Sequence, residues 1–215
     1  MIRPPSIRST STICARYTDV PGRCTYPATA GCRFAAPAER CLSYHLVTMS
    51  AMSMIGEYLR VTPTEMERAI QDPQWAYDYT EEVQDAQEEI ELAPHEARHF
   101  STHKAWDFLG FLLRRSRFPV DIVHGEQSFA EDQDWGYGPP KLLSAERVRL
   151  AAEALRSTSY DSLIDGVDPA ELFGVYPGVW DQPDALEWGR SPFDSLAVFI
   201  NAAAAASDAL LIWLD

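Results

Sequence analysis

The pattern of apolar and polar positions predicts a strand near the start of the regular part of the chain and another at its C-terminus. The segment 55–61 is short and rich in residues that favour strands. The segment 209–214 is continuously apolar over the length of one strand. A continuous apolar run of this length is typical of a strand that is buried on both faces. We therefore expect 209–214 to be buried in a sheet and to pair with 55–61.

The first helix is predicted by residues that cap helix ends. Thr62 has the side chain of an N-cap, Pro63 suits the first helical position, and Glu65 completes a capping box. This helix is expected to run to about Gln71, and Pro73 is expected to open the next one.

The second predicted helix has two unlike sides. One side carries a stripe of mainly apolar residues at helical spacing: Trp75, Tyr79, Val83, Ala86 and Ile90. The other side carries acidic residues without a basic partner: Asp78, Glu81, Glu82, Asp85, Glu88 and Glu89. Like charges at this spacing repel one another, so the helix depends on its tertiary contact. The acidic side is either a solvated outer face or a docking surface for a basic partner.

A third helix is predicted over residues 104–115, capped by Ser101 or Thr102. Asp107 interrupts its apolar pattern, and we expect this carboxylate to pair with Lys104 one turn earlier. More than half of the helix circumference is apolar, which predicts a central position in the fold. The apolar residues are Trp106, Phe108, Leu109, Phe111, Leu112 and Leu113.

The remainder of the chain adds a loop-rich segment and further helices. Residues 119–140 are punctuated by Gly and Pro, Ser144 is expected to cap a helix, and Asp168-Pro169 is expected to start a short one. Residues 193–204 form the last helical stripe. The predicted fold class is α+β: one compact domain in which several helices pack on a small sheet that includes 55–61 and 209–214.

Charge divides the chain into two parts. Residues 1–48 contain six Arg, two acidic residues and all four cysteines, whereas residues 49–215 contain 12 basic and 30 acidic residues. We expect 1–48 to be an extension of the functional domain at 49–215, either disordered or a mis-assigned start of translation. A targeting segment and a small cysteine-stabilised module are the alternatives, although the cysteine spacing matches no CxxC pattern.

The net charge of −14 over 215 residues narrows the classes of partner. It argues against nucleic-acid binding and against docking on an anionic membrane, since both require clustered Lys and Arg. Asn201, Ser207 and Asp208 interrupt the last apolar stretch, which argues against a transmembrane segment. The chain contains neither a P-loop nor a dinucleotide fingerprint, and we predict a protein without a cofactor.

The string His95-Glu96-Ala97-Arg98-His99 formally matches the HExxH pattern of zinc hydrolases, and His103 follows four residues later. In such enzymes two histidines one helical turn apart bind zinc, and the glutamate acts as a general base. Pro94 allows at most the first turn of a helix here, and no third ligand is evident. We therefore expect surface histidines near a loop-to-helix junction and keep the zinc hydrolase as a remote alternative.

Six short motifs occur in an order that resembles the YfbM-like family of small bacterial proteins, a domain of unknown function. The resemblance covers about residues 54–215 and implies a compact α+β cytoplasmic domain that begins near the first motif. It carries over no catalytic residue. The chain departs from the family pattern at Arg114-Arg115, where Thr-Gly is usual. The motifs are Met54-Ile55-Gly56, Lys104-Ala105-Trp106-Asp107-Phe108-Leu109, His124-Gly125-Glu126, Tyr137-Gly138-Pro139, Asp168-Pro169-Ala170 and Val175-Tyr176-Pro177-Gly178-Val179-Trp180.

Some residues of these motifs can form an aromatic cleft with acidic groups, suited to a flat or cationic ligand. The candidates are Trp106, Asp107, Glu126, Tyr137, Tyr176 and Trp180. The alternative is that Trp106 and Trp180 belong to the core and that Tyr137 lies in a packed turn.

The favoured function is a non-enzymatic interaction protein, for example one resembling an immunity protein, whose acidic surface binds a basic protein. A hydrolase or transferase that uses Asp107 and Glu126 as acid and base is the alternative.

Overall fold

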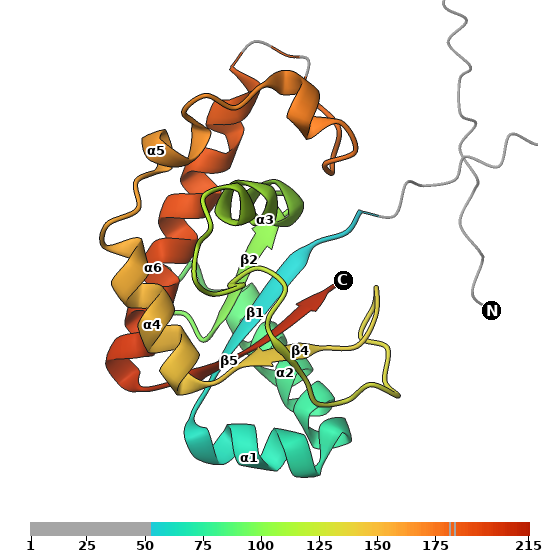
Figure 1. The fold of residues 1–215 in the computed structure, drawn as a ribbon. Coiled ribbons are helices and arrows are strands. Elements are labelled where there is room, and N and C mark those ends of the chain that lie inside the picture. The colour runs from blue at the N-terminus through green and yellow to red at the C-terminus, as the bar shows by residue number, and fades with distance from the viewer. Residues whose placement is uncertain (1–52, 181, 183) are drawn as a thin grey trace, which may run out of the picture. The chain divides into compact units, whose positions relative to one another are not determined.

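The protein is described by a computed structural model that covers residues 53–180, 182 and 184–215 (Figure 1). A five-stranded antiparallel sheet has the strand order β2-β1-β5-β4-β3. The strands are β1 (Gly56–Val61), β2 (His99–His103), β3 (Gln127–Ser128), β4 (Lys141–Leu143) and β5 (Ala209–Leu214).

The first and last strands pair along their whole length, as predicted. Gly56 lies opposite Leu214 at one end of the ladder, and Val61 lies opposite Ala209 at the other. Strand β5 is buried except at Leu214, which agrees with its continuous apolar sequence.

Several helices begin at residues that cap them with a side chain. Helix α1 is Pro63–Gln71, α2 is Pro73–Glu88, α3 is Trp106–Arg115, α4 is Ala145–Leu155, α5 is Tyr160–Ile164 and α6 is Arg190–Ala206. Two 3₁₀ helices, η1 (Pro169–Leu172) and η2 (Ala185–Gly189), lie between α5 and α6. The predicted capping box is present at the start of α1, and Ser144 and Asp168 cap α4 and η1 as expected.

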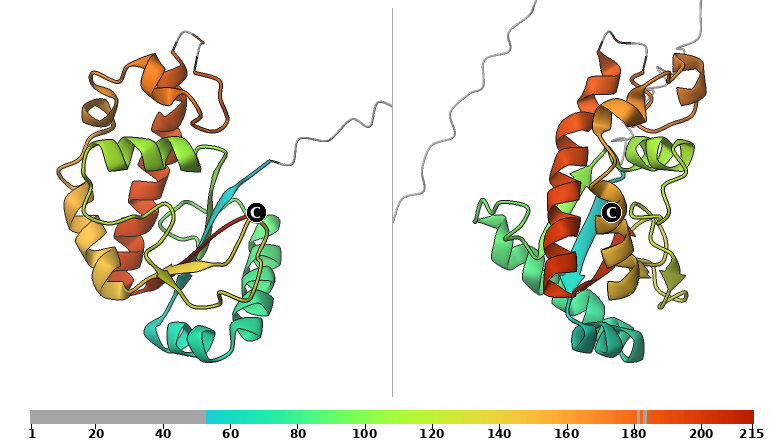
Figure 2. Two further views of the ribbon diagram at one scale, coloured as in Figure 1. Left: turned by 45° about the vertical axis from the view of Figure 1, so that its right-hand side comes forward. Right: turned by 60° about the vertical axis from the view of Figure 1, so that its left-hand side comes forward.

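Side chains from both faces of the sheet enter separate apolar cores. Tyr58, Leu210 and Ile212 point to the first core, where they join residues of α3, α4 and α6. Leu59 and Leu211 point to the second core, which α1 and α2 cover. Figure 2 shows α1 and α2 grouped apart from α3, α4 and α6. The predicted α+β fold, with helices packed on a small sheet, is confirmed.

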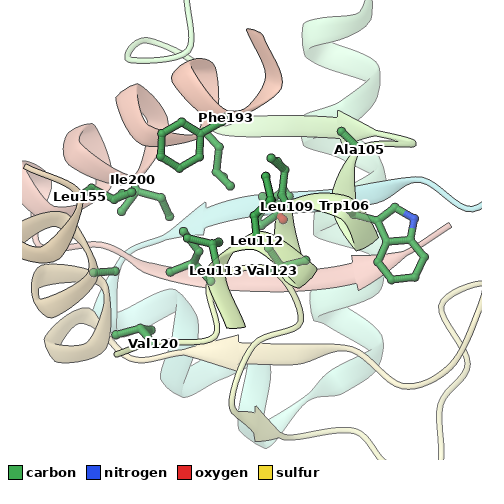
Figure 3. Close-up of a cluster of buried hydrophobic side chains, with 14 of the residues drawn as sticks. Ala105, Trp106, Leu109, Leu112, Leu113, Val120, Val123, Leu155, Phe193 and Ile200 are labelled. Atoms are coloured by element: carbon green, nitrogen blue, oxygen red, sulfur yellow. The ribbon is translucent and has the colours of Figure 1, made fainter. Parts of the chain in front are cut away.

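Helix α3 lies within the first core, as its broad apolar face predicts. Phe108, Leu109 and Leu112 are fully buried. Figure 3 shows side chains of α3 beside Phe193 and Ile200 of α6, with Trp106 at one end of the cluster. Six of the ten residues of α3 are buried, so this helix contributes strongly to the hydrophobic stabilisation of the domain.

Three predictions about helix ends and side-chain partners in residues 86–107 are wrong. Ser101 and Thr102 belong to strand β2 and cap no helix, since α3 begins at Trp106 without a side-chain cap. Thr102 is buried, and its hydroxyl donates to the carbonyl of Gly56 instead, so pairing with β1 overrides the local capping signal. Helix α2 ends at Glu88, which leaves Ile90 outside the predicted stripe and 54% exposed.

The third correction concerns the partner of Asp107. Its carboxylate accepts a hydrogen bond from the backbone N–H of Tyr176 at 2.9 Å and lies 3.8 Å from Arg114, not beside Lys104. A backbone donor from a distant loop therefore takes the place of the expected pair within the helix.

The predicted extension at 1–48 lies outside the described residues. Within the part of the chain that the structure describes, no helix is long and apolar enough to cross a membrane.

Candidate binding groove beside the edge strand

A groove of about 770 Å³ lies between the C-terminal half of α2, the segment that follows it and strand β2. Strand β2 is an edge strand because β1 is its only neighbour among the described strands. The residues that line the groove are Gln84, Asp85, Gln87, Glu88, Ile90, Glu91, Leu92, Pro94, Ala97, His99, Phe100, Ser101 and His103.

The groove combines acidic and apolar side chains at the surface. The carboxylates of Asp85, Glu88 and Glu91 are exposed. Beside them, Ile90 and Leu92 are 54% and 37% exposed. Covering apolar side chains of this size lowers the free energy of a complex. Neighbouring carboxylates favour a partner that carries positive charge.

A buried carboxylate lies beneath the groove. Glu57 of β1 is 6% exposed, and its Oε2 lies 2.7 Å from Nε2 of His99. The hydroxyl of Ser101 donates to Oε1 of Glu57 at 3.0 Å. Glu57 and Ser101 face each other in the register of β1 and β2, so strand pairing itself brings these groups together. The hydrogen bonds from these two partners offset the free-energy cost of burying the Glu57 carboxylate.

This cluster is not arranged for nucleophilic catalysis. A serine nucleophile requires its hydroxyl to donate to the histidine that removes its proton. Here the Ser101 hydroxyl donates to Glu57, which lies between the serine and His99. The cluster therefore joins β2 to β1 beneath the groove.

The amide side chain of Gln87 caps the outer edge of β2. Its Oε1 accepts hydrogen bonds from the backbone N–H groups of Arg98 and His99, at 2.8 and 3.1 Å. Its Nε2 donates to the carbonyl of His99 at 3.1 Å. Gln87 thus takes the place that an added strand would occupy at His99.

The HExxH string does not form the helix that a zinc hydrolase requires. Residues 94–96 form a turn, and His99 lies in β2. A strand directs His99 toward Glu57, whereas a helix would place it one turn above His95. No group of three His, Cys, Asp or Glu side chains suited to a metal ion is present in the described residues. The expectation of surface histidines holds for His95 and His103, which are exposed, and is wrong for His99, which is partly buried.

The predicted partner surface is exposed, and only some of its residues line the groove. All six acidic residues of α2 and its C-cap, Asp78, Glu81, Glu82, Asp85, Glu88 and Glu89, are solvent-exposed. Of these, Asp85 and Glu88 line the groove, and Asp78 accepts a hydrogen bond from Gln74 at 2.8 Å. Sequence reasoning missed Glu91, which follows the helix, and Glu57, whose only signal is an acidic residue in a β-prone segment.

Three of the six candidates for the aromatic cleft lie together. The rings of Trp106 and Tyr176 stack with their centroids 6.0 Å apart, and Asp107 binds the backbone N–H of Tyr176. Trp106 also meets His124 edge to face at 5.8 Å. Tyr137, 40% exposed, lines a second cavity together with His124.

The other two candidates have separate roles. Trp180 is 8% exposed, packs on Phe108 at 4.2 Å and donates to the carbonyl of Val175 at 2.7 Å, so it belongs to the core. Trp106 is equally buried. Glu126 forms two hydrogen bonds of 2.6 Å with Arg147, and this guanidinium holds the pKa of the Glu126 carboxyl below its ordinary value.

The two carboxylates of the enzymatic alternative have different partners. Asp107 is bound by Tyr176 N–H and lies near Arg114, whereas Glu126 is bound by Arg147 and by the N–H of Asp121. Asp107 and Glu126 share no hydrogen-bond or ion-pair partner among the described residues.

Comparison with known proteins agrees with the motif order. The model of the family described as "Domain of unknown function (DUF1877)" matches residues 52–213. The chain belongs to the DUF1877 family. Among solved structures, the chain is similar to YfbM from Escherichia coli, a protein of unknown function, with 18% identity and a TM-score of 0.44. That match covers 75% of this chain and 99% of YfbM. No curated protein matches the chain. The resemblance to the YfbM-like family is confirmed.

Several motifs that carry the DUF1877 resemblance meet in space. Trp106 contacts both His124 and Tyr176, and His124 lines one cavity with Tyr137, Gly138 and Pro139. Segments far apart in the sequence are thus assembled near the end of β5, on the other side of the sheet from the Glu57–His99 pair.

Proposed function

We propose that this DUF1877 domain is a non-enzymatic interaction protein that binds a basic segment of a partner protein in the groove between α2 and β2. The observation that carries the proposal is the juxtaposition of exposed Ile90 and Leu92 with the carboxylates of Asp85, Glu88 and Glu91. The matching segment carries Lys or Arg next to apolar side chains.

The charge of the whole domain supports this choice of partner. Residues 49–215 contain 30 acidic and 12 basic residues, so the domain attracts a basic protein before contact. Long-range attraction of this kind raises the association rate and weakens with salt. The apolar side chains of the groove supply attraction that salt does not screen.

The shape of the groove supports recognition through side chains. Gln87 occupies the backbone groups of His99 at the edge of β2, so the partner gains few main-chain hydrogen bonds at that position. The affinity for the partner then depends on the order of apolar and basic side chains along the partner's binding segment. An immunity protein that neutralises a basic toxin is one class of protein with such a surface.

The proposal is tested with a defined probe, a fluorescent peptide of four Arg-Leu repeats, by fluorescence anisotropy. We expect saturable binding that weakens as salt is added. Two control peptides separate the contributions: Glu-Leu repeats should not bind, and Arg-Ser repeats should bind more weakly because they lack the apolar contact.

A matched pair of variants locates the binding site. The double variant Asp85→Lys/Glu88→Lys reverses two charges in the groove, whereas Glu82→Lys/Glu89→Lys makes the same change nearby, outside its lining. We expect the first variant to lose binding and the second to keep most of it. Equal losses in both variants, or binding that salt does not affect, would refute a groove-specific site.

A further inference from the structure

A second cavity, of about 260 Å³, lies at the C-terminal end of β5 on the side of the sheet that faces α3. The residues that line it include the apolar Val123, Ile212 and Leu214 and the polar His124, Tyr137 and Lys141. Small-molecule sites in proteins commonly combine apolar walls with a few convergent polar groups. This cavity is independent of the groove and of the function proposed for it.

Lys141 is the most informative residue of the cavity. Five Lys or Arg residues are partly buried in the described part of the chain, and four of them, Arg60, Arg98, Arg147 and Arg190, have a carboxylate within 4.0 Å. Lys141 has none among the described residues, and its Nζ donates to the hydroxyl of Ser128. In a domain with 30 acidic residues, Lys141 is thus a partly buried cation that no described carboxylate neutralises at close range.

The backbone around Lys141 holds its stem in position. Gly125 has φ of +73°, and a Cβ at this residue would lie 2.6 Å from Cβ of Lys141. The absence of a side chain at Gly125 therefore allows this turn to pack directly on the lysine. Register also contributes, since Lys141 lies opposite Ile212 across the ladder of β4 and β5.

His124 presents a defined ring to the same cavity. Its Nδ1 lies 3.1 and 3.2 Å from the two carboxylate oxygens of Asp121, which places a proton on Nδ1. Burial raises the pKa of Asp121, but hydrogen bonds from the side chain and backbone of His124 outweigh it and hold the pKa below its ordinary value. The Asp121 carboxylate therefore stays ionised and orients the ring, which Trp106 supports from the side.

We propose that this cavity binds a small carboxylate with a flat apolar body, with Lys141 as the anion-binding group. A single ammonium matches one negative charge, and the described lining has no arginine of the kind that binds phosphate by two parallel hydrogen bonds. The apolar walls receive the body of the ligand, and His124 and Tyr137 also line the cavity.

The full-length chain offers a direct test because it contains only two lysines, Lys104 and Lys141. Protein labelled with ¹³C-lysine gives one Cε signal for each, assigned with lysine-to-arginine variants. Benzoate is the probe, and benzamide is its neutral match in shape. We expect benzoate to shift the Lys141 signal in a saturable manner, to leave Lys104 unchanged, and to shift Lys141 far more than benzamide does.

Variants then measure the contribution of the charge. Lys141→Met keeps most of the stem and removes the ammonium, and we expect benzoate affinity to fall by about tenfold or more. Lys104→Met, at an exposed position outside the cavity, should leave it unchanged. The proposal is overturned if benzoate and benzamide act alike, if both lysine signals move together, or if Lys141→Met binds benzoate normally. Should Lys141→Met fail to fold, the wild-type comparison of the two probes decides alone.

Discussion

The network around Glu65 allows a quantitative prediction about acid stability. Glu65 accepts hydrogen bonds from Arg98 at 2.7 and 3.2 Å, from Tyr79 at 2.8 Å and from the N–H of Thr62 at 2.7 Å. Burial raises the pKa of this carboxyl, but the hydrogen bonds from Arg98, Thr62 and Tyr79 outweigh it and lower the pKa from 4.5 to about 2. The charged form is therefore strongly favoured by the fold.

The size of the effect follows from that pKa difference. The full difference between 4.5 and about 2 corresponds to about 3 kcal/mol of folding stability. The Arg98 side chain is 38% exposed, so solvent screens part of the interaction, and we expect about 1–2 kcal/mol. Because the folded-state pKa is lowered, this stability is present above pH 4.5 and is lost as the pH falls toward 2.

The perturbation is Glu65→Gln, which keeps the capping-box geometry and removes the charge. Urea unfolding should show a loss of about 1–2 kcal/mol at pH 7, and the gap between wild type and variant should narrow steadily below about pH 4.5. Glu67→Gln, at an exposed position of the same helix, is the control and should cost little. A gap that stays constant between pH 7 and pH 3 would refute the assigned role of the Glu65 charge.

Three further changes test the packing. Leu109→Ala removes a fully buried side chain of α3 and should cost about 2–5 kcal/mol in urea unfolding, whereas Ile70→Ala, at a position 48% exposed, should cost much less. Gly189→Ala should lower the thermal midpoint, at a cost of about 1–3 kcal/mol, because its Cβ would lie 2.8 Å from Phe108; an unchanged midpoint would contradict this contact. Tyr58→Phe should leave stability unchanged or higher, because the buried Tyr58 hydroxyl has no hydrogen-bond partner in the described residues. A clear loss in calorimetry would reveal a partner for that hydroxyl.

The fold was predictable wherever local signals agree with burial. The capping residues of α1, α4 and η1 and the apolar run of β5 led to correct elements because side-chain caps and hydrophobic periodicity act over a few residues. The prediction for residues 99–103 was wrong because pairing with β1 outweighs the local preference for a helix cap. The predicted partner of Asp107 was also wrong, because the Tyr176 N–H that binds its carboxylate comes from 69 residues away.

The sites were predictable only in part. The acidic side of α2 was evident from spacing, and the motif residues Trp106 and Tyr176 do meet. The roles of Gln87 and Lys141 were not evident from the sequence. Gln87 meets the backbone groups of β2 only in the folded chain, and Lys141 is notable because no described carboxylate lies beside it. Lys141 stands out only once the other partly buried cations are seen to have carboxylate partners.

By itself, the sequence determined the class of the fold, the family, the position of most helices and the acidity of the domain. These properties depend on residue type and on periods of two to four residues, which a single chain displays directly. Only the tertiary structure decided that His99 meets Glu57, that Gln87 caps the edge of β2, and that Lys141 faces a cavity without a carboxylate. Those contacts depend on strand register and loop closure, and their physical basis is the burial of two cores rather than any local preference.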